Sequence, residues 1–372
     1  MYDIAIVGSG PAGATLARML GERYRVLLID RRRLDLDVAD ATLTKPCGGL
    51  LAPAAQKELA RQGLGLPHDV VAGPQLFAVR TIDLAANVER LYQRFYVNVD
   101  REAFDRWLVS LVPAGVRRCH GWSLESLEPD ADAPTLHFRT AEGGRASVRA
   151  KLVIGADGAG STVRRLAYGD LAAPERYRAI QAAFDASSGD AYYGAIFDAS
   201  LTDFYGWTIP KGGTLLVGCA FPAGAGAGAP QRFDELVTRL RRHGFRFGRE
   251  FSRTAGAVAR PSRAHHLLAG TGRVLLVGEA AGFISPSSAE GISYALRSAA
   301  HLAGALSRGI DGADERYAMA ALPLALDVGV KAAKASAIYG ATVRRAVMRS
   351  GIGAIPSGPS RLPTPTFGGF AR

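Results

Sequence analysis

The chain has 372 residues, of which 48% are hydrophobic and 44 are glycine, and its formal net charge is +11. This length and composition exclude a disordered chain and a small disulfide-stabilised domain, and they favour a compact α/β protein of two or three domains. Three scattered cysteines are typical of a reducing, intracellular setting. No nucleic-acid-binding motif accompanies the positive charge, so we expect no nucleic acid partner.

The first thirty residues predict one strand–helix–strand unit, with strands at Ile4–Val7 and Arg25–Ile29 and a helix at Pro11–Glu22. The turn between the first strand and the helix is a glycine fingerprint. Its glycines permit a tight turn, the approach of a pyrophosphate and close helix packing. Asp30 follows the second strand, where a carboxylate can accept both hydroxyls of an adenosine ribose. The unit predicts a dinucleotide site that consists of Gly8, Gly10, Pro11, Ala12, Gly13 and Asp30.

Two later strands, Lys151–Gly155 and Arg273–Val277, also end in loops of small residues. We expect the three strands to lie in one parallel sheet whose carboxyl ends share a ligand. In these loops Asp157 can hold a ribose, or stand in a turn without a ligand, and Glu279 can bind a ribityl hydroxyl. The following helix N-terminus can direct N–H groups at a flavin. No second glycine fingerprint exists for a tightly held nicotinamide, which favours FAD as the ligand. The residues of these later loops that we expect to hold FAD are Asp157, Gly158, Gly278, Glu279, Pro286, Gly291 and Ile292.

The remaining segments predict a second sheet and a helical end. Residues 70–98 and 176–260 are rich in aromatic and β-branched residues, which is typical of strands. Residues 222–230 predict a flexible connector, and residues 292–348 predict helices. The predicted fold class is α/β: a Rossmann-like FAD-binding domain, an inserted antiparallel β-sheet substrate domain, C-terminal helices and a flexible tail. Their predicted bounds are 1–69, 99–175 and 261–349 for the FAD-binding domain, 70–98 and 176–260 for the substrate domain, and 350–372 for the tail.

The three loops, together with the run Asp100–Asp105, resemble the flavoprotein superfamily of the para-hydroxybenzoate hydroxylase type. Within it, the runs Lys45–Gly49 and Tyr205–Lys211 are similar to the geranylgeranyl reductase family, and the resemblance covers about residues 1–345. The resemblance implies that Arg101 contacts FAD and that a loop beside the isoalloxazine ring includes Lys45, Cys47, Gly48 and Gly49. That family usually has Asp where this chain has Glu279.

Three residues are candidates for the catalytic step. The thiol of Cys47 could tune the flavin ring or donate a proton, or it could simply be a small residue in a crowded loop. Tyr205 and Trp207 could stack on the flavin or line a substrate pocket, and ordinary packing in the sheet is the alternative. The run that follows Tyr205 also partly matches a halogenase pattern, with Tyr205 in place of its first Trp.

The resemblance implies an FAD-dependent oxidoreductase that reduces carbon–carbon double bonds of an apolar small molecule, such as an isoprenoid. Electrons would come from NADPH, NADH or another donor, including an electron-donor protein. An FAD-dependent monooxygenase that hydroxylates an aromatic substrate is one alternative, and a non-catalytic flavin-binding protein is another. We predict no metal site.

We expect a cytoplasmic protein, because Met1–Asp3 lead directly into a strand and no apolar run approaches the ~20 residues of a spanning helix. Any membrane contact would be peripheral, through a C-terminal helix that carries Lys331, Lys334, Arg344, Arg345 and Arg349. Ordinary packing of an amphipathic helix is the alternative interpretation.

Overall fold

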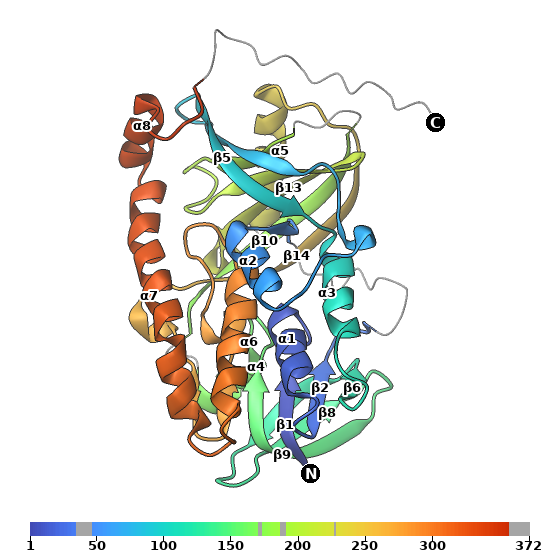
Figure 1. Ribbon diagram of the computed structural model, residues 1–372. Coiled ribbons are helices and arrows are strands. Elements are labelled where there is room, and N and C mark those ends of the chain that lie inside the picture. Colours follow the sequence, from blue (N-terminus) through green and yellow to red (C-terminus); the bar gives the residue numbers. More distant parts are fainter. Residues whose placement is uncertain (35–46, 170–172, 187–190, 227, 357–372) are drawn as a thin grey trace.

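The computed structural model describes residues 1–34, 47–169, 173–186, 191–226 and 228–356. Two β-sheets, one above the other in Figure 1, form the two halves of the molecule, and α7 and α8 run along one edge of both halves. Lys45 and residues 357–372 of the predicted tail lie outside the described residues.

The first sheet confirms the predicted parallel arrangement. Its order is β15-β16-β9-β1-β2-β6, and β1 pairs in parallel with β2 and β9, while β9 pairs in parallel with β16. A hairpin of β7 and β8, which the sequence analysis did not predict, extends it from β9. The strands are β1 (Tyr2–Val7), β2 (Val26–Asp30), β6 (Arg117–His120), β7 (Ser123–Glu128), β8 (Thr135–Arg139), β9 (Arg145–Gly155), β15 (Gly270–Thr271) and β16 (Val274–Leu276).

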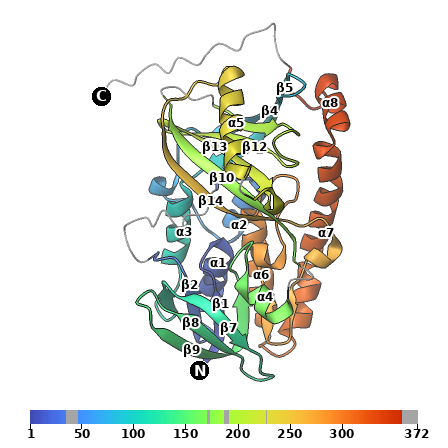
Figure 2. The same cartoon turned by 180° about the vertical axis from the view of Figure 1, so that it is seen from behind.

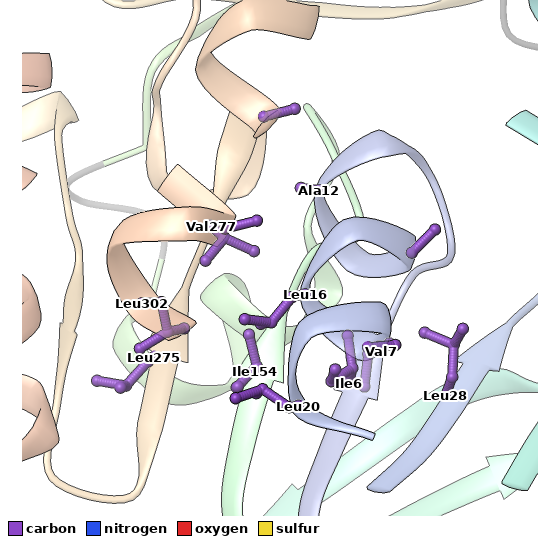
Figure 3. Close-up of a cluster of buried hydrophobic side chains, with 14 of the residues drawn as sticks. Ile6, Val7, Ala12, Leu16, Leu20, Leu28, Ile154, Leu275, Val277 and Leu302 are labelled. Carbon is purple, nitrogen blue, oxygen red and sulfur yellow. The ribbon is translucent and has the colours of Figure 1, made fainter. Parts of the chain in front are cut away.

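Helices α1 and α6 pack together against this sheet and form its main core. Figure 3 shows Leu16 and Leu20 of α1 next to Ile154 of β9, together with Leu275 of β16 and Leu302 of α6. Strands β1, β2 and β16 and the last residues of β9 are buried on both faces, which is why they appear in the sequence as unbroken apolar runs. The helices of this half are α1 (Pro11–Leu20), α2 (Pro53–Arg61), α3 (Arg101–Ser110), α4 (Thr162–Tyr168) and α6 (Ile292–Leu306).

The second sheet is the predicted inserted sheet, but it is mixed rather than wholly antiparallel. Its order is β14-β10-β13-β12-β11-β4-β5-β3, and β11 pairs with β4 in parallel. The parallel pair lies where the two insertions meet, since β4 comes from the first and β11 from the second. The strands are β3 (Leu50–Leu51), β4 (Leu76–Asp83), β5 (Val88–Asn98), β10 (Glu175–Asp185), β11 (Tyr193–Phe197), β12 (Gly206–Lys211), β13 (Thr214–Pro222) and β14 (Glu250–Arg260).

Helix α5 (Gly228–Arg242) covers one face of the second sheet with Phe233, Leu236 and Leu240. The helix begins inside the segment that was predicted as a flexible connector, and Ala223–Ala225 form a 3₁₀ turn before it. The prediction was therefore wrong for these residues. Ala229 is buried, so burial of one apolar face stabilises the helical start against the flexibility of the glycines.

The C-terminal helices are α6, α7 (Ala313–Tyr339) and α8 (Ala341–Ser350), so the helical prediction is confirmed and extends two residues further. Arg344 of α8 is buried and forms an ion pair of 2.9 Å with Asp83 of β4. None of the helices in the described ranges is long and apolar enough to cross a membrane. The domain bounds given above stay a prediction.

Candidate functional site

Three loops meet at the carboxyl ends of β1, β9 and β16. Ala156 donates a backbone hydrogen bond of 2.7 Å to Val7, and Val277 donates one of 2.9 Å to Gly155. A Cβ on Gly8, whose φ is +103°, would lie 2.5 Å from the carbonyl oxygen of Ala156. The packing of one loop on another therefore explains this glycine without any ligand.

Gly10 differs from its neighbours in the fingerprint. A Cβ on Gly13 would lie 1.8 Å from the Gly8 carbonyl oxygen, whereas a Cβ on Gly10 would meet only Nη2 of Arg32, at 3.9 Å, among the described residues. Gly10 is also the residue that precedes α1, and Pro11 and Ala12 form the first turn of that helix. Open space beside the N-terminus of a helix fits the pyrophosphate of FAD.

Asp30 is almost fully buried at the end of β2. Its Oδ2 accepts hydrogen bonds of 2.7 Å from both the backbone N and the hydroxyl of Ser9, and Arg32 donates to both of its oxygens. Burial raises the pKa of Asp30, but Arg32 and Ser9 lower it by more, so the net pKa is lowered and the carboxylate is ionised. A ribose hydroxyl would replace one of these donors, and this role of Asp30 stays a prediction.

A chain of charged side chains leads from Asp30 toward Cys47, and in it the two carboxylates are buried and the two arginines partly buried. Arg32 donates a hydrogen bond of 3.0 Å to Asp105, and Arg101 donates two to the same carboxylate, at 2.7 and 3.2 Å. Burial lowers the pKa of Arg101, but Asp105 and Cys47 raise it by more, so the side chains of Arg101 and Cys47 interact. The structure thus brings together Arg101 and Cys47, which the resemblance implied separately. Arg32 and Asp105 were not predicted as site residues, although Arg101 and Asp105 have the four-residue spacing of a helical ion pair.

The loop that contains Cys47 lies against the second sheet. A Cβ on Gly48 would be 2.1 Å from Cδ1 of Ile209 on β12, and a Cβ on Gly49 would be 2.2 Å from the carbonyl oxygen of Val99. The two adjacent glycines therefore allow the close approach of this loop to β12 and to the end of β5.

Lys211, at the end of β12, is a residue that the predicted site did not include. Its Nζ donates hydrogen bonds of 2.6 Å to Oδ1 of Asn98 and to the carbonyl oxygen of Val99. Burial lowers the pKa of Lys211 to about 8, although Cys47 and Asp100 act in the opposite direction. Its position directly after a Tyr-x-Trp-x-x-Pro run was the available signal.

Tyr205 and Trp207 lie on the side of β12 that faces the Cys47 loop. The hydroxyl of Tyr205 accepts a hydrogen bond of 3.1 Å from Tyr193 and donates one of 2.7 Å to the carbonyl oxygen of Ser288, in the loop between Pro286 and Gly291. Trp207 donates a hydrogen bond of 3.0 Å to Gln181. Burial raises the pKa of Tyr205 and of Tyr193, so both are protonated at neutral pH.

The two later carboxylates have partners within the protein. Asp157 accepts hydrogen bonds from the Ser161 hydroxyl and from two backbone N–H groups at the start of α4, at 2.5 to 3.1 Å. Glu279 accepts one of 2.9 Å from the backbone of Ala259 on β14. These contacts fix the loops that contain Gly158 and Gly278. The roles of both carboxylates toward FAD stay predictions.

The N-terminus of α6 completes the site. Gly291 precedes the helix, and Ile292 is its first residue. Glu290 accepts hydrogen bonds of 2.8 and 2.6 Å from the backbone N and the hydroxyl of Ser293, which orders this helix start. Pro286 lies in the loop before it. Their contacts with FAD stay predictions.

Comparison with known proteins agrees with this geometry. Protein CbrA of Escherichia coli O9:H4 (strain HS) is 39% identical over 368 residues, which are 98% of each chain. A geranylgeranyl bacteriochlorophyll reductase-like protein of Thermoplasma acidophilum has the same fold, with a TM-score of 0.74, 19% identity and coverage of 92% of this chain and 90% of that one. PqsL of Pseudomonas aeruginosa, a probable FAD-dependent monooxygenase, has a TM-score of 0.66, 18% identity and coverage of 94% and 98%.

A family model described as an FAD-binding domain matches residues 1–320. The open space beside Gly10, the helix N-terminus behind it and the partly buried Arg101 fit an elongated anionic cofactor. The chain therefore belongs to the FAD-binding-domain family.

Proposed function

We propose that this protein reduces carbon–carbon double bonds of an apolar substrate, for example an isoprenoid. The observation that supports this most is a cluster of apolar and aromatic side chains on one face of the second sheet, where Gly48 of the Cys47 loop lies against Ile209. We call this cluster the wall, and it includes the buried side chains of Leu76, Tyr177, Phe197, Phe204, Tyr205, Trp207 and Ile209, together with Ile284 from the loop before α6. An apolar substrate gains free energy on leaving water for such a surface.

Saturation of a double bond adds one hydride and one proton. Bound FAD, reduced by NADPH, NADH or another donor such as an electron-donor protein, supplies the hydride chemistry. The protein must then supply the proton and keep the substrate in place. We assign the proton step to Tyr205, because its hydroxyl is protonated at neutral pH and Tyr193 can restore the proton through their hydrogen bond.

Cys47 and Trp207 have different roles in this proposal. Cys47 stands at the end of the charge chain that Arg101 and Asp105 form, so its thiol is the second candidate proton donor. Trp207 is fixed by Gln181 and contributes its ring to the apolar wall. We assign it a substrate-lining role.

The test is an anaerobic assay with FAD-loaded protein, dithionite as the donor and a geranylgeranyl compound as the acceptor. Mass spectrometry should detect a product that has gained two hydrogen atoms. Tyr205→Phe should lower turnover without loss of FAD, and Cys47→Ala tests the second donor. Cys219→Ala is the matched control, because Cys219 is buried in the separate cluster beneath α5. Absence of any saturated product would contradict the proposal.

Hydroxylation of an aromatic substrate is the second candidate function. The aromatic members of the wall would stack on such a ring, and PqsL, which has the same fold, is described as a probable monooxygenase. Oxygen uptake that depends on an aromatic substrate and matches the amount of hydroxylated product would favour this function. A bound flavin that no donor reduces at a useful rate would instead indicate a non-catalytic flavin-binding protein.

A further inference from the structure

We propose that α7 and α8 hold this protein on an anionic membrane surface. The proposal starts from α7, which is apolar on two opposite sides. One side, with Tyr317, Leu324 and Val328, is buried in the first half of the molecule. A helix that is apolar all round needs neighbours on every side.

The opposite side of α7 is exposed. Met319, Leu322, Leu326 and Val330 have exposed fractions of 73%, 51%, 63% and 69%. Their spacing of three or four residues places them in one line along the helix. Exposed apolar patches of this kind mark surfaces that bind a protein or a membrane.

The exposed line is followed by further apolar residues on α8 and just after it. Figures 1 and 2 show α7 and α8 along the same outer edge of the molecule. We call the whole set the apolar edge, and it consists of Met319, Leu322, Leu326, Val330, Val343, Val347, Ile352 and Ile355, all of which are exposed.

Positive charge beside the apolar edge indicates that its partner is anionic. The acidic residues of α7 are Asp314, Glu315 and Asp327, and residues 328–356 contain five basic residues and no acidic one. Lys331 pairs with Asp327 at 3.0 Å and Arg344 pairs with Asp83 at 2.9 Å, while Lys334 and Arg349 are exposed. Apolar side chains beside uncompensated positive charge match the acyl chains and headgroups of anionic lipids. A second copy that used the same edge would bring like charges together.

The edge would lie on the membrane and would not cross it. Helix α7 contains Pro323, Asp327 and two lysines, and none of the helices in the described part of the chain could span a bilayer. This inference does not depend on the proposed reaction, because it rests on a surface outside the site.

The experiment is flotation of the full-length, FAD-loaded protein with vesicles of phosphatidylglycerol or of phosphatidylcholine. We expect binding to phosphatidylglycerol that weakens with salt. Leu322→Gln/Leu326→Gln/Val330→Gln should lower it at least tenfold. Lys334→Glu/Arg349→Glu should lower it only on the anionic vesicles, by at least roughly fivefold for each basic residue replaced.

The control variant is Phe251→Gln, because Phe251 is 50% exposed on β14, away from α7 and α8. It should bind as the unmodified protein does, and all variants should retain bound FAD and the same unfolding temperature. Three results would overturn the proposal: no binding of the unmodified protein, unchanged binding of the triple variant, or a dimer in solution that the triple variant converts to a monomer. No turnover is measured, so none of these results bears on the proposed reaction.

Discussion

The buried carboxylate of Asp105 is the negative charge between two partly buried arginines, Arg32 and Arg101, and its removal should strongly destabilise the protein. Asp105 is 2% exposed and accepts one hydrogen bond from Arg32 and two from Arg101. In Asp105→Asn the amide oxygen can keep at most the two bonds that Oδ2 accepts, and both lose the carboxylate charge. One charge-assisted bond is then lost outright and two are weakened, and a bond to a charged group contributes about 1.5–3 kcal/mol net. We expect the free energy of unfolding to fall by about 3–5 kcal/mol, the range for a broken buried ion pair.

The assay is urea unfolding of the FAD-free and the FAD-saturated protein. Glu102→Gln is the matched control on the same helix, because Glu102 pairs with Arg106 at 2.8 Å while their side chains are 31% and 26% exposed. Such a partly exposed pair contributes at most about 1 kcal/mol. If Asp105→Asn destabilised the protein no more than Glu102→Gln does, the reasoning would be refuted.

The stability lost in Asp105→Asn should depend on pH. Burial raises the pKa of Asp105, but Arg101 and Arg32 lower it by more, so the net pKa is lowered. A lowered carboxylate pKa contributes stability above the unfolded value of about 3.9 and loses it as the pH falls further. The difference between the unmodified protein and Asp105→Asn should therefore shrink below about pH 4. A difference that stayed constant there would contradict the assigned ion pairs.

Three further predictions concern the glycines and Lys211. Gly10→Ala should unfold like the unmodified protein but bind FAD more weakly in calorimetric titration, whereas Gly13→Ala should fail to fold, because its Cβ would lie 1.8 Å from a backbone oxygen. Unchanged FAD affinity of Gly10→Ala would argue against a pyrophosphate at that position. Gly49→Ala should lower thermal stability by at least about 1–2 kcal/mol more than Gly48→Ala does. The φ of Gly49 is +62° and a Cβ there would meet backbone, whereas a Cβ on Gly48 would meet only the movable end of a side chain. Burial lowers the pKa of Lys211 from 10.5 to about 8 in the folded protein. Between pH 8 and pH 10.5 the unfolded state therefore binds more protons than the folded state, and the free energy of unfolding should rise with pH over this range. Urea unfolding of Lys211→Met should lack this rise, and an equal slope in both proteins would exclude the lowered pKa.

The parallel sheet and its loops could be predicted from the sequence because each requirement is local. A strand that is buried on both faces needs an unbroken apolar run, and a loop packed on another loop needs a glycine where Gly8 stands. The same is true of α1, since Pro11 is favoured at the first position of a helix. Each of these residues is required by its local structure, so the local sequence is enough to predict that structure.

The features that could not be predicted depend on pairs of distant residues. The parallel pairing of Tyr193 with Val79 joins two separate insertions, and no local pattern specifies which strands meet there. Likewise, Asp157 and Glu279 are acids in loops at strand ends, but their backbone partners become evident only in the fold. Sequence patterns identify where a carboxylate stands, and the tertiary structure decides what it binds.

The ion pair between Arg344 and Asp83 also constrains the order of events during synthesis. Asp83 is fully buried in the finished sheet, and its partner lies 261 positions later in the chain. When the ribosome has made both insertions of the second sheet, Asp83 on β4 still lacks its counter-ion, Arg344. Burying that charge alone is unfavourable, so the sheet must keep this end hydrated until α8 emerges. Helix α8 then supplies the counter-ion that completes this end of the second sheet.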